Sequence, residues 1–169
     1  MTSYSIRRAT INDLSAITRT YNKAILTTVA TFDTEPKTME EQRGWFAQHG
    51  DKYPLLVAES NDAVVGWAAL SAWSDRHAYA DTAEISVYVD EDFQGKGIGR
   101  VLSEAVIKAG EEAGLHTLIA RIVEGNEASV HIAETQGFVH IGIMREVGRK
   151  FGRLLDVYLM QKIYDEPGD

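Results

Sequence analysis

The chain has 169 residues, of which 44% are apolar and 25% charged, so its composition fits a single globular domain over residues 1–169. It contains no cysteine, which excludes disulfides, thiolate zinc sites and a cysteine nucleophile. The formal net charge of −8 disfavours nucleic acid as a partner, because such binding draws its affinity from neutralising phosphates.

The first segments predict a strand followed by a helix. Residues 4–9 have the pattern of a short strand. Thr10 and Asp13 resemble a capping box, with Asp in place of the usual Glu, and open a first helix. Helical spacing predicts that this helix has one apolar face, formed by Ile11, Leu14, Ile17, Tyr21 and Ile25.

A second helix and a pair of strands are predicted next. Thr38 begins another capping box, and the helix that follows it is expected to end near residues 49–50. Residues 54–59 form a short apolar strand, residues 61–62 make a turn, and residues 64–72 return as the partner strand.

The rest of the chain alternates strands and helices less regularly. The predicted elements are a strand over 82–89, a helix over 100–113, a strand over 115–122, a helix over 127–136, and strands over about 138–146 and 154–163. The resulting order, β-α-α-β-β-β-α-β-α-β-β, predicts an α/β (α+β type) fold. Its mixed, mostly antiparallel sheet has about seven strands and is flanked by about four helices. This is not the regular alternation of a doubly wound dinucleotide-binding fold.

Three alternating glycines, Gly95, Gly97 and Gly99, lie between the strand over 82–89 and the next helix. Glycines allow successive backbone N–H groups to point into one concavity, and the helix N-terminus adds its positive dipole end. The turn therefore predicts a phosphate or pyrophosphate site, with Lys96 and Arg100 as added positive charge. It matches neither a P-loop, which needs Ser or Thr after Gly-Lys, nor the dinucleotide fingerprint, which needs a small residue at position 100. A tight strand-to-helix connection without a ligand is the alternative.

The segment Gln94-Gly95-Lys96-Gly97-Ile98-Gly99 resembles the Q/R-x-x-G-x-G/A signature of the GCN5-related N-acetyltransferases (GNAT), whose loop binds the pyrophosphate of acetyl-CoA. The resemblance covers roughly residues 6–162. It implies a fold with splayed central strands, in which backbone groups of Val87, Tyr88 and Val89 bind the pantetheine arm of acetyl-CoA, the expected co-substrate. Residues 126–129 resemble the N-x-A-S element of the family, which places Asn126 and Ser129 on the cofactor. Asn126 also fits a plain helix N-cap.

Three further segments resemble the phosphinothricin and methionine sulfoximine N-acetyltransferases within this superfamily. They are Thr31-Phe32-Asp33, the run from Trp73 to Glu84, and the run from Gly148 to Gln161, in which Leu154 replaces the usual Trp. This resemblance implies transfer of an acetyl group to the amine of a small amino-acid-like molecule. The alternatives are a GNAT enzyme that acetylates a peptide, protein or polyamine amine, and a non-catalytic acyl-CoA-binding regulatory module.

Glu84 is at the proposed general-base position of this group and is the predicted catalytic residue, since a neutral amine must attack the thioester. A salt-bridged strand residue is the alternative for Glu84. A backbone N–H near Val89 would polarise the thioester carbonyl. Many relatives have Tyr or His on the last helix as general acid, but the aligned residue here is Ala133. His131 points about 200° away on a helix, so Tyr88 or a water is left as the possible acid.

The resemblance also predicts the acceptor site. Arg76 is the candidate to bind the carboxylate of an amino acid through its guanidinium group. Phe32 and Tyr79 are expected to line the side-chain pocket, and Lys150 to approach an anionic group. Lys150 belongs to a basic cluster over residues 145–153 that is otherwise expected to be a solvated loop.

The expected partners are a small-molecule acceptor and, because relatives commonly pair through their C-terminal region, a second copy of the chain in a homodimer. The histidines show no metal-ligand spacing, so no metal is proposed. The sequence lacks an apolar run of the about 20 residues that a membrane helix needs, and Met1–Arg8 has no apolar leader. We therefore expect a cytoplasmic protein without a membrane partner.

Overall fold

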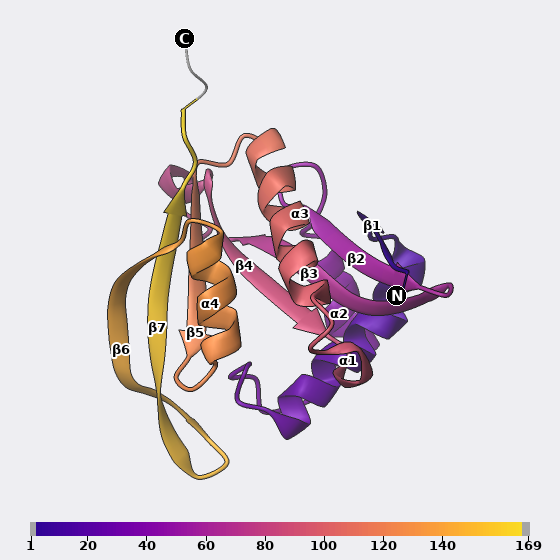
Figure 1. Cartoon of the computed structure of the whole chain (residues 1–169), viewed down its shortest axis with the longest axis horizontal. Helices are drawn as coiled ribbons and strands as arrows, with labels where there is room; N and C mark the ends of the chain where they lie inside the picture. The colour runs from indigo at the N-terminus through magenta and orange to yellow at the C-terminus, as the bar shows by residue number, and fades with distance from the viewer. Residues whose placement is uncertain (1–2, 167–169) are drawn as a thin grey trace.

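The computed structural model describes residues 3–166 as a seven-stranded sheet with helices on both faces (Figure 1). The strands are β1 Ser5–Arg8, β2 Leu55–Ser60, β3 Ala63–Ala72, β4 Thr82–Val89, β5 Thr117–Val123, β6 Val139–Lys150 and β7 Arg153–Ile163. The helices are α1 Leu14–Thr27, α2 Met39–Phe46, α3 Ile98–Glu112 and α4 Glu127–Thr135, with short 3₁₀ helices at Ile11–Asp13, His77–Tyr79 and Glu91–Phe93. The sheet order is β1-β2-β3-β4-β5-β7-β6, and every neighbouring pair is antiparallel except β4 and β5. The predicted mixed, mostly antiparallel sheet and its four helices are confirmed.

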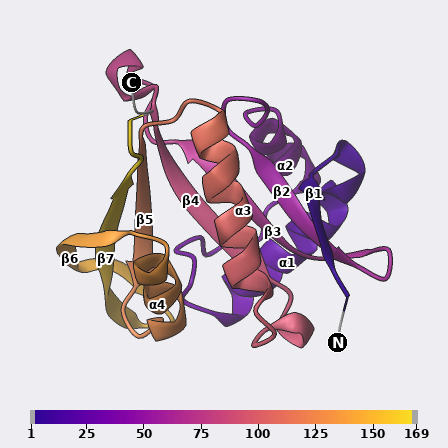
Figure 2. The same ribbon diagram turned by 45° about the horizontal axis from the view of Figure 1, so that its top comes forward.

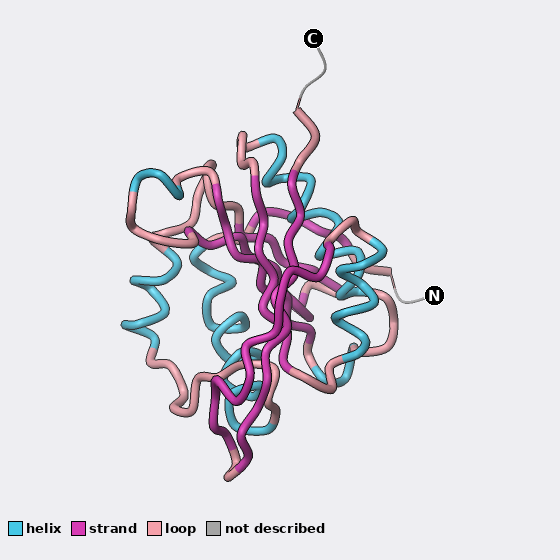
Figure 3. Tube along the Cα trace, turned by 90° about the vertical axis from the view of Figure 1, so that its left-hand side faces the viewer, coloured by secondary structure: helices cyan, strands magenta, loops and turns pink. Residues whose placement is uncertain are grey.

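Alternate residues of the central strands supply two separate apolar cores, because successive side chains of a strand point to opposite faces. On β3, Ala68 and Leu70 pack into the core that includes α3 and α4, whereas Trp67 and Ala69 pack into the core that includes α1 and α2. Figure 2 shows α3 and α4 over one face of the sheet, and Figure 3 shows helices on both sides of the strands. Both faces of the central strands are therefore covered.

Strands β4 and β5 separate along their length. Their parallel pairing joins residues 82–84 to residues 117–119 and goes no further in the described part of the chain. The antiparallel pairing of β4 with β3 continues to Val89, so β4 stays in the sheet on its other side. Figure 1 shows the two strands diverging from their shared end. The backbone of residues 85–89 is therefore open on the β5 side, which confirms the predicted splay of the central strands.

Two predicted details of the helices are wrong. Ile11 was expected on the inner face of the first helix, but it is 54% exposed to solvent. It lies in the 3₁₀ turn that precedes α1, where side chains are spaced by about 120° instead of 100°, so it leaves the apolar stripe. The second helix ends at Phe46 rather than near residues 49–50, because the next N–H groups of Gln48 and His49 bond to carbonyls three residues back.

The expected gap between the last two strands, residues 147–153, is also wrong, because most of it is paired as strand. The register of β6 against β7 shifts between Met144 and Gly148, and Glu146 adopts a positive φ of 49°. The N–H of Glu146 donates to Asp156 Oδ1 at 2.7 Å, which holds this bulge in place. Pairing then resumes and brings Lys150 opposite Arg153, so the basic cluster lies on the two strand ends of a β-hairpin.

Candidate active site

The glycine turn joins the end of β4 to the start of α3. Gly95 and Gly97 have φ values of 73° and 81°, in the left-handed region that other residues adopt only at a cost. Gly97 is the N-cap of α3 and offers no side chain to the first-turn N–H groups. These N–H groups and the helix dipole are therefore available to an anion at this end of α3.

The side chains of the turn brace it from outside. Gln94 Nε2 donates to Val89 O at 3.1 Å, and Lys96 Nζ donates to Asp92 O at 2.9 Å. Arg100 forms an ion pair with Glu104 one helical turn on. Ile98 is buried and anchors the start of α3 in the core. The predicted residues 94–100 thus lie together in one turn, in which Gly95, Lys96, Gly97 and Arg100 are exposed to solvent and Gly99 is half-buried.

The open edge of β4 is the second part of the predicted cofactor site. Val87, Tyr88 and Val89 lie beyond the last pairing with β5, on the splayed part of β4. At the start of α4, Asn126 Oδ1 accepts the N–H of Ser129 at 3.3 Å, so Asn126 is a helix N-cap. The turn, the open edge of β4 and the N-terminus of α4 contain every residue predicted to bind the cofactor.

Glu84 lies at the fork of the sheet, as the last β4 residue that pairs with β5. Its carboxylate receives two hydrogen bonds from the Arg121 guanidinium, one of them from Nη2 to Oε1 at 2.8 Å. This ion pair raises the pKa of Arg121 above its ordinary value. The salt bridge considered as the alternative role of Glu84 is therefore present in the structure. The two hydrogen bonds from the Arg121 guanidinium hold the carboxylate in one orientation.

A cavity of about 390 Å³ lies between β3, β4 and the first two helices. It is lined by Tyr21, Asp33, Lys37, Glu41, Gln42, Trp45, Trp67, Ser71, Glu84, Ser86 and Tyr88. Four of these side chains are aromatic and contact one another, with ring centroids 5.2 Å apart for Tyr21 and Tyr88 and 5.0 Å apart for Trp67 and Tyr88. Of the predicted site residues, Glu84 and Tyr88 are in this lining. The sequence did not indicate the other lining residues, which come from segments far apart in the chain.

Tyr88 is held as a phenol at one side of the cavity. Burial raises its pKa to about 12, and its hydroxyl lies 3.4 Å from Ala30 O, to which it donates. Tyr21 beside it donates to Asp33 and lies 3.0 Å from Thr31 Oγ1, and burial raises its pKa as well. Both phenols therefore remain protonated at neutral pH.

Lys150 contacts the loop that carries Phe32 rather than solvent. Lys150 is buried, and its Nζ donates to Thr31 O at 2.8 Å. Burial lowers its pKa below the ordinary value. The Phe32 ring lies against Gly148, where an added Cβ would come within 2.1 Å of the ring. The structure thus brings Phe32 and Lys150 to the same loop. The next residue of this loop, Asp33, lines the cavity.

Arg76 and Tyr79 lie apart from this contact. Both belong to the segment between β3 and β4, where residues 77–79 form a 3₁₀ helix, and both are exposed. On α4, His131 is exposed and Ala133 is buried in the core. His131 and Ala133 therefore lie on different faces of α4.

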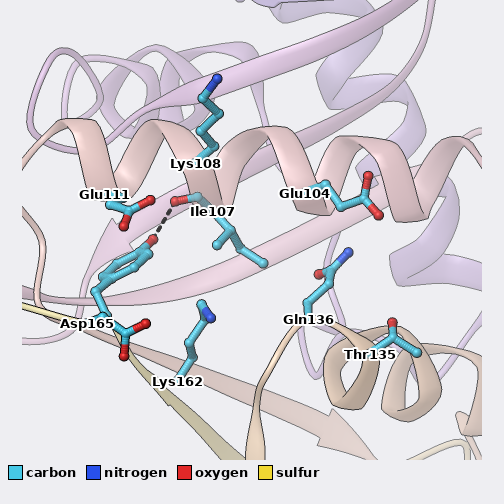
Figure 4. A pocket seen from close by; sticks show the side chains of 9 residues that line it. Glu104, Ile107, Lys108, Glu111, Thr135, Gln136, Lys162 and Asp165 are labelled. Atoms are coloured by element: carbon cyan, nitrogen blue, oxygen red, sulfur yellow. Dashed lines mark hydrogen bonds between the residues drawn. The ribbon is translucent and has the colours of Figure 1, made fainter.

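A second cavity, of about 360 Å³, lies between α3, α4 and the end of β7 (Figure 4). It is lined by Glu104, Ile107, Lys108, Glu111, Thr135, Gln136, Lys162, Tyr164 and Asp165. The hydroxyl of Tyr164 donates a hydrogen bond to Ile107 O on α3 at 2.5 Å. The predicted site residues are not part of this lining.

Two features are absent from residues 3–166. No helix there combines the length and the apolar character needed to cross a bilayer. No group of three or more His, Cys, Asp and Glu side chains within this range is arranged to hold a metal ion.

Comparison with known proteins identifies the family. The acetyltransferase (GNAT) domain family matches residues 6–159. The chain is a GNAT acetyltransferase. It is 40% identical over 163 residues to the L-amino acid N-acyltransferase MnaT of Escherichia coli (strain K12), covering 96% of this chain and 95% of that protein.

Two other relatives of this GNAT chain carry the names of the predicted branch. It is 39% identical over 161 residues to the L-methionine sulfoximine/L-methionine sulfone acetyltransferase of Pseudomonas paraeruginosa (strain DSM 24068 / PA7), covering 94% of each chain. It is 39% identical over 156 residues to the phosphinothricin N-acetyltransferase of Streptomyces coelicolor, covering 90% of this chain and 91% of that protein. The predicted family and branch are confirmed.

The fold of this GNAT chain also matches a solved structure with a ligand. The protein yncA of Salmonella typhimurium, solved with its cofactor acetyl-CoA, superposes with a TM-score of 0.93 at 36% identity. The match covers 99% of this chain and 98% of that one. A relative of the same fold and length thus holds acetyl-CoA.

Arg121, whose guanidinium holds the Glu84 carboxylate, was not predicted from the sequence. It lies on β5, 37 positions beyond Glu84 in the chain, with its guanidinium 5.8 Å from the centroid of the Trp73 ring. The sequence gives little indication of this role, because an arginine on a predicted strand belongs to no recognisable motif. The contact becomes visible once the register that pairs Glu84 with Ile119 places Arg121 two residues along β5.

Proposed function

We propose that this chain transfers the acetyl group of acetyl-CoA to the α-amine of a small amino-acid-like acceptor, such as phosphinothricin or methionine sulfoximine. The observation that carries the proposal is the position of Glu84. It stands at the fork where β4 leaves β5 and also lines the 390 Å³ cavity beside β4. A carboxylate there lies between the open edge proposed for the cofactor and the cavity proposed for the acceptor.

Acetyl-CoA would bind along the glycine turn and the open edge of β4. The pyrophosphate is assigned to the first-turn N–H groups of α3 and to the turn formed by Gln94, Gly95, Lys96, Gly97, Ile98, Gly99 and Arg100. The pantetheine arm is assigned to backbone groups of Val87, Tyr88 and Val89, with Asn126 and Ser129 at the start of α4 on its other side. An extended amide-bearing chain suits an open strand edge, because it can complete the hydrogen bonds that β5 leaves unmade.

The chemistry is direct attack of the amine on the thioester, without a covalent enzyme intermediate. Glu84 accepts a proton from the ammonium group, directly or through a water, and the neutral amine attacks. The N–H of Val89 polarises the carbonyl, which stabilises the charge that develops on its oxygen. The thiol has an intrinsic pKa of about 8.5, so it can leave as thiolate as the C–S bond breaks. The second proton that the attacking nitrogen loses as the amide forms then reaches the thiolate, relayed by Tyr88 or by a water.

The cavity fits a small acceptor better than a peptide. Its volume of about 390 Å³ is within the range of small-molecule sites, and four aromatic side chains would enclose the acceptor side chain. Arg76 and Tyr79 would close over the acceptor from the segment before β4, with Arg76 on its carboxylate. Phe32 and Lys150 act from the other side, where Lys150 holds the Thr31 carbonyl of the loop that precedes Asp33.

We further propose that the chain acts as a cytoplasmic homodimer that pairs through β6. This strand lies at the edge of the sheet. Its exposed apolar side chains are Val139, Ile141, Ile143 and Val147, each at least 46% exposed. An apolar edge strand invites pairing with another chain, and a second copy is the partner that would cover it.

Replacement of Glu84 by Gln tests the catalytic assignment. Glu84→Gln keeps the size of the side chain and removes the base, so we expect kcat to fall by about 10²–10⁴-fold while the affinity for acetyl-CoA is nearly unchanged. Thiol release gives the first quantity and calorimetry with CoA gives the second. Turnover that equals that of the wild type would contradict the role of Glu84.

A further inference from the structure

The wall of the cavity beside Glu84 carries a hydrogen-bonded pair that the chemistry above does not use. Ser71 on β3 has its Oγ 3.0 Å from Nε2 of His49, which lies just beyond α2. The other ring nitrogen of His49, Nδ1, lies 2.9 Å from Trp45 O. The His49 ring also packs against the Trp45 ring, with centroids 4.5 Å apart. His49 therefore has contacts on both nitrogens and on one ring face.

These contacts fix the direction of the Ser71 hydroxyl. A backbone carbonyl only accepts hydrogen bonds, so the Nδ1 of His49 must carry the proton that it donates to Trp45 O. Burial lowers the pKa of His49, which favours the neutral ring with a single N–H. Nε2 is then an acceptor, and the Ser71 hydroxyl donates to it. The Ser71 oxygen is left with lone pairs alone for any other neighbour.

Ser71 and Glu84 are neighbours across two strands. The register of β3 against β4 places Ser71 directly opposite Glu84, so both side chains lie on the same face of the sheet. Both also line the 390 Å³ cavity. A carboxylate and an acceptor-only hydroxyl oxygen thus face one space, with Arg121 holding the carboxylate from β5. Two adjacent acceptors match a group with several N–H donors.

We propose that Ser71 binds the acceptor's ammonium group beside Glu84, and that His49 is the positioning residue that keeps the Ser71 hydroxyl turned away from it. This inference rests on the proposed function and adds the contact that selects an amine. An ammonium donates one N–H to Glu84 and one to Ser71. When Glu84 takes its proton, the bond to Ser71 remains and holds the neutral amine in place while its lone pair turns toward the thioester.

The test compares an amine with its des-amino analogue. The ligands are L-methionine sulfone and 4-(methylsulfonyl)butanoate, titrated by calorimetry into the full chain in the presence of CoA. Ser71→Ala should weaken binding of the amine about tenfold or more, as expected for a hydrogen bond to a charged group, and leave the affinity for the des-amino ligand unchanged. Ser71→Thr keeps the hydroxyl and should restore the preference for the amine. Ser60→Ala, on β2, removes a hydroxyl that donates to Ser3 O and should change neither affinity.

His49 is tested through Ser71. His49→Ala frees the hydroxyl to rotate and should weaken binding of the amine, but it should add no further loss in a chain that already carries Ser71→Ala. Additive losses for the amine, or an equal loss for both ligands, would show that His49 only tethers α2 to β3 and would overturn its positioning role. A Ser71→Ala chain that binds both ligands as the wild type does would overturn the amine contact itself.

Acetyl transfer measured on the same protein keeps the two proposals separate. Turnover of the amine with an acceptor KM that Ser71→Ala leaves unchanged would overturn the Ser71 contact and retain the transferase. Failure of the wild type to acetylate any amine, together with a Ser71-dependent preference for the amine ligand, would overturn the proposed function and retain the contact.

Discussion

Gly148 shows how one missing side chain shapes the loop beside the cavity proposed for the acceptor. Its φ is outside the left-handed region, so the backbone there suits other residues. The constraint is instead the Phe32 ring, which would lie 2.1 Å from an added Cβ. Phe32 precedes Asp33 of the cavity lining and follows Thr31, whose carbonyl accepts from Lys150. The position of this loop therefore depends on the absence of a Cβ at residue 148.

Gly148→Ala should displace Phe32 and shift its loop. We expect the KM for the acceptor to rise severalfold and the protein to lose about 1–3 kcal/mol of stability, as overpacked positions do, with the KM for acetyl-CoA unchanged. Gly142→Ala is the matched control on the same strand, because nothing lies within 4 Å of its added Cβ. Steady-state kinetics and thermal unfolding check both variants, and equal behaviour of the two would contradict the role of Phe32.

At the residue scale, what could be predicted depends on whether a residue belongs to a motif. The glycines of the turn and Glu84 could be predicted as site residues because their spacing or position is typical of a function. Arg121 was missed because it contacts Glu84 across 37 positions, and the His49–Ser71 pair joins segments 22 positions apart. The first contact depends on the register of β4 against β5 and the second on how α2 packs on β3, and neither is specified by a local sequence pattern.

The elements were largely predictable because caps, turns and periodicity are local. Thr38 and Glu41 form the predicted capping box at α2, and β4 has the predicted bounds. The bulge in β6 was not predictable, because the side chain of Asp156 across the hairpin holds the positive φ of Glu146. Beyond the bulge, β6 pairs with β7 again as far as Lys150, in a stretch where a loop was expected.

Gly97 at the N-terminus of α3 gives a test of the turn as a cofactor element. Gly97→Ala places a Cβ at a φ of 81°, which costs about 1–2 kcal/mol, and should weaken binding of acetyl-CoA while the KM for the acceptor stays unchanged. Gly114→Ala is the matched control after the other end of α3, with a φ of 80°. Melting temperatures should fall alike for both, and calorimetry with CoA should show a loss for Gly97→Ala alone. An equal loss of affinity in the control would contradict the assignment of the turn.

At the scale of the whole molecule, the exposed apolar side chains of the edge strand β6 are the feature that concerns assembly within residues 3–166. Pairing of two copies through the C-terminal region was expected from the resemblance rather than from residue patterns. Ile143→Lys would place a charge on that edge, where Ile143 is 46% exposed. We expect the wild type to be a dimer and this variant a monomer, because a buried unpaired charge opposes association. Leu26→Lys on α1, where Leu26 is 57% exposed, is the control and should stay dimeric. Light scattering after gel filtration measures both, and a monomeric wild type would contradict the pairing.

The fold as a whole was predicted better than the acceptor site. The order of elements and the splay of β4 from β5 follow from local patterns and a family signature. The cavity could not be predicted, because it is formed by side chains of two helices, the loop between them and two strands, which meet only after folding. Its four aromatic side chains and its small volume are what favour an amino-acid-like acceptor over a peptide.

The most direct measurement for the central claim is thiol release from acetyl-CoA with a panel of acceptors. The panel contains L-phosphinothricin, L-methionine sulfoximine, ordinary amino acids, spermidine and a short peptide. The account predicts strong turnover with the first two and little with spermidine or the peptide. Turnover with the peptide or spermidine alone would contradict the acceptor assignment, and a chain that binds acetyl-CoA but acetylates none of them would contradict the proposed transfer to an amino-acid amine.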